Sequence, residues 1–233
     1  MTSGTIDPED RWLHRVGGIS ALAIGVGYFA IVALYIPMGA PPNGAEARLG
    51  QIAENARAWW AILGLSVVTD VLFLPLAMSL YAALRQFHRN AMLLAATFIA
   101  MFVLLDLGLT WTNYAALITL SGRYAETASE AQRATVVAAA EYPTVIVESD
   151  LLFVYNSLTL ALGFIAAGFV MRKGVFSKGT AYLSIVTGTL GVVSVAGPFV
   201  LPALGVMIVV TSVLSAVLVL LLGARLYRLG SAG

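Results

Sequence analysis

Long apolar stretches alternate with short polar segments along all 233 residues of the chain. A helix needs roughly 20 apolar residues to cross the hydrocarbon core of a bilayer. Six stretches reach that length, at approximately 14–38, 58–84, 91–120, 144–171, 180–199 and 203–224. The first is too long, and its flank too acidic, for a cleaved signal peptide. The pattern predicts an all-α polytopic membrane protein with six transmembrane helices in one domain, residues 1–233.

The polar segments between these stretches predict how the helices are paired and oriented. Nine Lys and Arg residues fall at one end of the helices, in the N-terminus, 85–90, 172–179 and the C-terminus, and four at the other end. Cytoplasmic loops are enriched in Lys and Arg. We therefore expect three helical hairpins in the cell (cytoplasmic) membrane, with both termini cytoplasmic.

Two of the outer connections are long, and each predicts a short amphipathic surface helix, at approximately 44–56 and 128–140. The stretches "NGAE" at 43–46 and "TASE" at 127–130 have the spacing of capping boxes. Trp59 and Trp60, at the outer end of the second helix, are expected to anchor it at the membrane interface. Small residues recur every four positions on the first and fifth helices and predict close helix packing: Gly17, Ala21, Gly25, Ser184 and Gly188.

Composition supports the membrane class and removes several kinds of chemistry. Hydrophobic residues make up 60% of the chain and charged residues 11%, against about 45–50% and about 25% in soluble domains. A net charge of +1 offers no basic field for nucleic acid. The absence of cysteine excludes disulfides, thiolate metal sites and iron–sulfur clusters. We expect neither a metal nor another cofactor.

Two acids interrupt the apolar stretches: Asp70 in "SVVTDVLFLPLAMSLY" and Asp106 in "MFVLLDLGLTW". Counted from the connection between helices two and three, both lie roughly 21–22 Å along their helices, which predicts a carboxyl pair near mid-membrane. A charged side chain there costs about 2.5–3.5 kcal/mol, and neither helix contains a compensating Lys or Arg. We expect at least one of the pair to be protonated at neutral pH. Pro75 frees the carbonyl of residue 71 as an acceptor.

Further polar side chains at similar depth predict a pocket that opens outward. The candidate ligand-binding residues are Asp70, Asp106, Asn113, Thr110, Tyr28, Asn156 and Ser66. Interhelical hydrogen bonding is the favoured alternative for the neutral members of this set. Glu148 and Asp150 are secondary candidates near the outer end of helix four, where the helix dipole and snorkelling account for acids.

Three segments resemble a family of uncharacterised six-helix prokaryotic membrane proteins, a domain of unknown function: "RVGGIS", "SGRYAETASEAQRATVVAAAE" and "LGFIAAGFVMRKGVFSKGTAYLSIVTGTLG". The resemblance implies six helices and a prokaryotic cell membrane. It brings no catalytic or ligand-binding residues with it.

The function that the sequence favours is binding or transport of a small molecule or cation at the carboxyl pair. One alternative is a structural or accessory subunit, in a homo-oligomer or with a partner protein in the lipid bilayer. A membrane-embedded enzyme acting on lipids is the least favoured, because the sequence contains no catalytic motif of the GxSxG, HExxH or phosphate-loop type.

Overall fold

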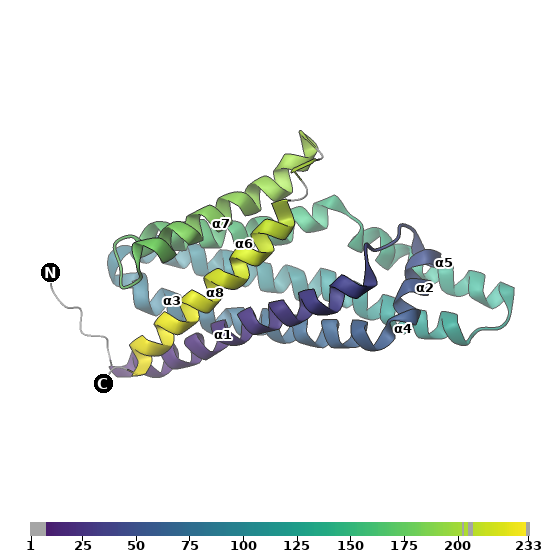
Figure 1. The fold of residues 1–233 in the computed structure, drawn as a ribbon, viewed down its shortest axis with the longest axis horizontal. Helices are drawn as coiled ribbons and strands as arrows, with labels where there is room; N and C mark the ends of the chain where they lie inside the picture. The colour runs from purple at the N-terminus through teal and green to yellow at the C-terminus, as the bar shows by residue number, and fades with distance from the viewer. Residues whose placement is uncertain (1–7, 202, 205–206, 232–233) are drawn as a thin grey trace.

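The computed structural model describes residues 8–201, 203–204 and 207–231, in which all regular structure is helical (Figure 1). The helices are, in chain order, α1 (Pro8–Tyr35), η1 (Ile36–Met38), α2 (Ala45–Glu54), α3 (Ala56–Leu105), η2 (Asp106–Trp111), α4 (Thr112–Glu126), α5 (Glu130–Val147), α6 (Asp150–Met171), α7 (Lys178–Ala196), η3 (Gly197–Phe199) and α8 (Met207–Ser231). Five helical stretches in this part of the chain are long and apolar enough to cross a membrane. The prediction of an all-α protein built on long apolar helices is confirmed.

The longest of these stretches, Ala56–Glu126, is two antiparallel runs and not one rod. His88 breaks the helical conformation, with φ −164° and ψ 85°. Phe73 and Phe102, one from each run, have ring centroids 5.4 Å apart, whereas a straight helix would separate them by about 44 Å. The Nδ1 atom of His88 accepts a hydrogen bond from the backbone N–H of Ala91 at 3.2 Å. The chain therefore reverses at His88, which caps the second run.

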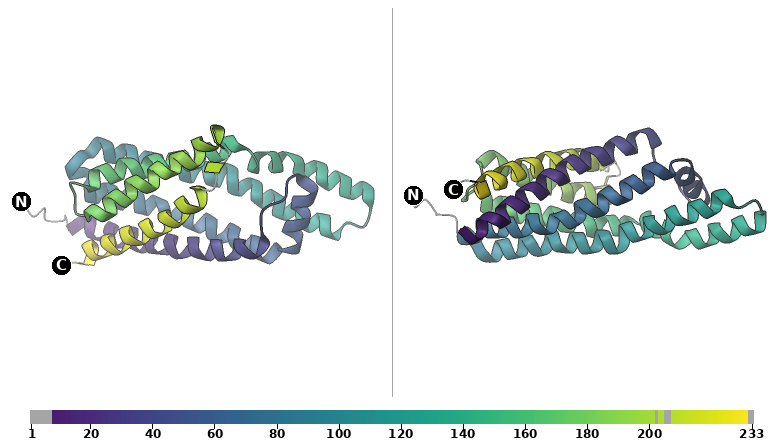
Figure 2. Two further views of the ribbon diagram at one scale, coloured as in Figure 1. Left: turned by 45° about the horizontal axis from the view of Figure 1, so that its top comes forward. Right: turned by 90° about the horizontal axis from the view of Figure 1, so that it is seen from below.

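The long helices pack closely through small residues. α1 lies against α8 and α3, and α6 lies against α7 and α3 (Figures 1 and 2). A Cβ atom on Gly188 of α7 would lie 2.5 Å from the carbonyl oxygen of Ala161 on α6, so only glycine fits there. The stripes of small residues are thus covered by neighbouring helices of the same chain.

The molecule has two ends of different character (Figure 1). The described parts of the N- and C-terminal helices meet at one end, here called the terminal end, where the Arg15 Nε–H donates to the carbonyl of Gly230 at 2.7 Å. At the opposite, distal end, α2, α4 and α5 share a second small core with part of α3. The run from residue 89 to residue 126 is about 57 Å long at 1.5 Å per residue, and its distal part extends beyond the length that crosses a bilayer.

Several expectations about the distal end are wrong. Trp59 is only 1% exposed and lies between the rings of Tyr35 and Tyr114, at 5.5 and 5.2 Å, so it is a core residue and not an interfacial anchor. Trp60, beside it, is 54% exposed. Trp59 is buried because α2 folds over this part of α3 and covers one face of it.

The expected capping boxes do not form. The N-cap residues are Gly44 for α2 and Ser129 for α5, and neither makes a side-chain cap hydrogen bond. The hydroxyl of Thr127 instead donates to the carbonyl of Arg123 at 2.7 Å, because α4 continues to Glu126. The second surface helix is also longer than expected, since α5 runs to Val147 and α6 begins only at residue 150.

Candidate functional site

The structure brings Asp70 and Asp106 together. Each lies 18 residues from His88, one on either side of the reversal, so equal helical rise carries both to the same level. Asp70 is on the first run of α3 and is 2% exposed, and Asp106 begins η2. The two side chains are neighbours and line the same cavity. The two acids form a carboxyl pair inside the helical bundle.

A change of helical pitch places a third group beside the pair. The segment Asp106–Trp111 is π-helical. In a π-helix, the residue five positions after a given residue lies one turn above it. The indole Nε1–H of Trp111 donates to Oδ2 of Asp106 at 3.1 Å. In a regular α-helix, a residue five positions on points about 140° away. The π-turn therefore supplies a donor that a regular helix would direct elsewhere.

Asn156 on α6 holds Asp106 from the other side. Its Nδ2 atom donates to Oδ1 of Asp106 and to Oγ1 of Thr110, each at 2.7 Å. Neither Asn156 nor Thr110 lines the cavity described below. Both act as supports that fix the position of the Asp106 carboxyl group.

Asp70 is far less well satisfied. Its buried Oδ2 atom has no hydrogen-bond partner among the described residues. The buried hydroxyl of Ser66, one turn earlier, also lacks one, and Thr69 donates to the carbonyl of Ser66 at 2.9 Å. In particular, Oδ2 of Asp70 makes no hydrogen bond to the carbonyl that Pro75 was expected to free, as far as the structure describes the chain. A buried carboxyl oxygen with no donor is an acceptor available to a ligand.

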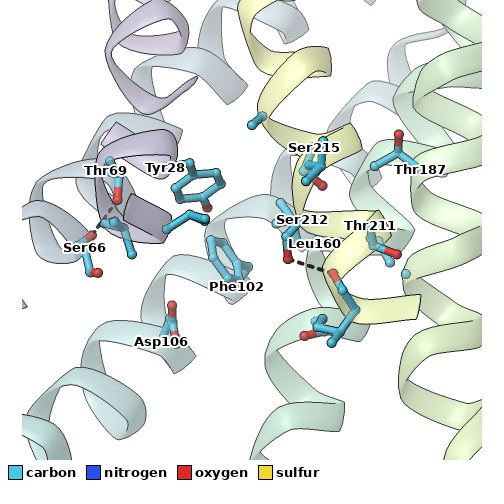
Figure 3. A pocket seen from close by; sticks show the side chains of 18 of the residues that line it. Tyr28, Ser66, Thr69, Phe102, Asp106, Leu160, Thr187, Thr211, Ser212 and Ser215 are labelled. Atoms are coloured by element: carbon cyan, nitrogen blue, oxygen red, sulfur yellow. Dashed lines mark hydrogen bonds between the residues drawn. The ribbon is translucent and has the colours of Figure 1, made fainter. Parts of the chain in front are cut away.

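The pair faces a cavity of about 500 Å³ lined by residues of α1, α3, η2, α6, α7 and α8 (Figure 3). Tyr28 and Phe102 lie in the middle of it, with Asp106 on one side. The opposite wall carries hydroxyl groups from α7 and α8, those of Thr187, Ser194, Thr211, Ser212 and Ser215. The remaining walls are mostly apolar, and no described Lys or Arg contributes to the lining. The cavity thus combines an apolar interior with two acids and a facing row of hydroxyls.

Of the residues predicted for the site, four line this cavity: Tyr28, Ser66, Asp70 and Asp106. Asn113 does not, because the π-turn changes the register and its side chain donates to the carbonyl of Leu109 at 2.7 Å.

The secondary candidates do not reach the pair. Glu148 forms an ion pair with the buried Arg48 at 2.9 Å and accepts from the backbone N–H of Gly44 at 3.2 Å. It therefore fastens α2 to the junction between α5 and α6. The side chain of Asp150 lies outside the described residues.

Sequence reasoning missed Trp111 and the hydroxyl wall. The π-turn that positions Trp111 left no signal in the apolar pattern. The wall did leave one, because Thr187, Gly191 and Ser194 share one face of α7, and Thr211 and Ser215 share one face of α8. Within the described residues, no group of three or more His, Cys, Asp or Glu side chains is placed to hold a metal ion.

Comparison with known protein families finds no family model that matches this chain. Comparisons with curated proteins and with solved structures likewise find no match. The resemblance to uncharacterised six-helix membrane proteins stays a prediction, and the function has to be argued from the geometry of the site.

Proposed function

We propose that this chain is a six-helix protein of a prokaryotic cell membrane that binds a small molecule or cation at the Asp70–Asp106 pair, and transports it. The observation that carries the proposal is the buried, unpartnered Oδ2 atom of Asp70. It lies in a cavity to which no described Lys or Arg contributes. A ligand that donates hydrogen bonds or carries positive charge would compensate this oxygen.

The arrangement suits reversible binding. Asp106 is oriented by Trp111 and Asn156, whereas Oδ2 of Asp70 has no hydrogen-bond partner among the described residues. Two adjacent carboxyl groups in a low-dielectric site favour holding one proton between them. Binding of a cation would release that proton, and the exchange offers a way to couple ligand movement to a proton gradient.

The proposed topology has three hairpins with both termini cytoplasmic. It is supported by the reversal at His88, which makes two runs out of Ala56–Glu126, and by the contact between Arg15 and Gly230 at the terminal end. The Lys and Arg residues concentrated at that end favour the cytoplasmic side.

The competing functions have less support. An accessory subunit was suggested by the stripes of small residues, but these pack against helices of the same chain. A lipid-modifying enzyme would need acids that lipid headgroups can reach, whereas Asp70 is 2% exposed inside the helical bundle.

Native mass spectrometry of gently extracted protein tests the proposal. We expect wild type to carry an adduct of defined mass that is lost in Asp70→Asn and Asp106→Asn. Glu141→Gln, which changes an exposed acid on α5, is the matched control and should keep the adduct. An adduct that persists in both Asn variants, or spectra without any adduct in wild type, would overturn the proposal.

A further inference from the structure

The cavity has an open side, and the packing of α1 and α8 locates it. Near the terminal end these helices touch through glycines, with Gly18 against the backbone of Tyr227 and Gly25 against Leu220. Beyond Gly25 the two helices diverge toward the distal end (Figure 1). The residues that α1 and α8 contribute to the cavity lining come from these diverging parts, 28–35 of α1 and 208–216 of α8.

Three apolar side chains mark the rim of this opening. Phe29 and Val32 on α1, and Val213 on α8, line the cavity and are also 47%, 43% and 47% exposed. They belong to helices apolar enough to span a membrane. Around such helices the solvent is lipid, so the opening faces the acyl chains of the bilayer and not water.

The lining indicates what kind of molecule would use such an opening. Its walls are mostly apolar, as for an alkyl chain, and its volume of about 500 Å³ is typical of sites for small organic ligands. Its polar end contains two acids without a described Lys or Arg, a setting that is complementary to a cation. An anionic phosphate head would instead be repelled by the carboxyl groups.

We propose that the site takes a single-chain amphiphile with a protonated amine head, which enters sideways from the bilayer between α1 and α8. The amine lies at the Asp70–Asp106 pair, where Oδ2 of Asp70 accepts from it, and the alkyl chain extends past Phe29 and Val213 toward the lipid. Ser215 and Thr187 face the head from the opposite wall. The hydroxyl of Thr187 is buried and has no described hydrogen-bond partner. This inference rests on the proposed function and adds the ligand class and the route.

The experiment compares two amines with the same head. Radiolabelled dodecylamine partitions into lipid, and butylamine stays mainly in water. Each is titrated against the full-length protein in phosphatidylcholine nanodiscs, with empty nanodiscs subtracted. We expect saturable dodecylamine binding that is at least tenfold weaker in Asp70→Asn, and butylamine binding at least tenfold weaker than that of dodecylamine.

The route is tested by filling the opening. Val213→Trp and, from the facing helix, Val32→Trp should each slow dodecylamine uptake at least tenfold. Val217→Trp, one turn away on the exposed face of α8 and outside the lining, is the matched control and should leave uptake unchanged. Two opposing rim positions keep the test valid if one variant fails to fold.

The outcomes separate the two proposals. If both amines bind with equal affinity and neither rim variant has an effect, sideways access by an amphiphile is overturned. Loss of the binding of both amines in Asp70→Asn would still support a ligand site at the pair. If neither amine binds saturably, the proposal of an amine ligand is overturned. The adduct in the native mass spectrum of the wild-type protein then decides whether the carboxyl-pair proposal stands. Binding that is unchanged in Asp70→Asn overturns both.

Discussion

Asn156 makes the interhelical hydrogen bonds that hold the acid of η2, and its removal gives a quantitative test of the site. Its amide donates to Asp106 and to Thr110 at 2.7 Å each. A hydrogen bond to a charged group contributes about 1.5–3 kcal/mol in soluble proteins. Interhelical hydrogen bonds in membranes average about 0.6 kcal/mol and reach about 1.7. Because the Asp106 contact is short and partly buried, we expect about 1–2 kcal/mol of coupling.

A double-mutant cycle isolates this coupling from the other effects of each substitution. Asn156→Ala, Asp106→Ala and the double variant are unfolded with increasing dodecyl sulfate in mixed micelles, and helicity is followed by circular dichroism. A second cycle pairs Asn156→Ala with Asp10→Ala, at the terminal end, and should give less than about 0.5 kcal/mol. A coupling below about 0.5 kcal/mol between Asn156 and Asp106 would refute the idea that α6 orients the carboxyl group.

Three further changes test the fold around the site. His88→Ala should lower the free energy of unfolding by about 1 kcal/mol by removing a helix cap, and His88→Asn should restore most of it. Arg48→Met should cost about 1–3 kcal/mol by leaving Glu148 without its cation; both are measured by the same unfolding assay. Gly188→Val should abolish monodisperse protein on size-exclusion chromatography, because its Cβ has no room, whereas Gly64→Val, in open space, should not.

The shared level of the two acids along their helices could be predicted from the sequence because level is a matter of counting residues. Apolar length locates a helix in the bilayer, and rise per residue is constant along it. The direction in which a side chain points depends in addition on the pitch. The π-turn at Asp106 changes the pitch inside the predicted helix, so Trp111 turned toward the acid while Asn113 turned away.

The boundaries at the distal end could not be predicted because distant residues set them. The stretch 144–147 forms the beginning of the fourth predicted span, yet it belongs to α5. The break that follows it is at Glu148, which is held by Arg48 and Gly44, about 100 residues earlier in the chain. Burial of Trp59 under α2 has the same origin. Hydropathy reports the local preference for lipid and carries no information about such contacts.

Asp70 destabilises the fold by more than its contacts with other residues stabilise it. At the proposed depth in the membrane, a charged acid is unfavourable by about 2.5–3.5 kcal/mol, and the interhelical hydrogen bond from Asn156 to Asp106 recovers about 0.6 kcal/mol at the membrane average. Asp70 recovers less, since its Oδ2 atom has no described partner, and an apolar residue of similar volume would pack there without this penalty. The compensation therefore has to come from a bound proton or from a ligand. Both exchange with the surroundings, which is the property that a binding or transport site requires and that a purely structural contact does not.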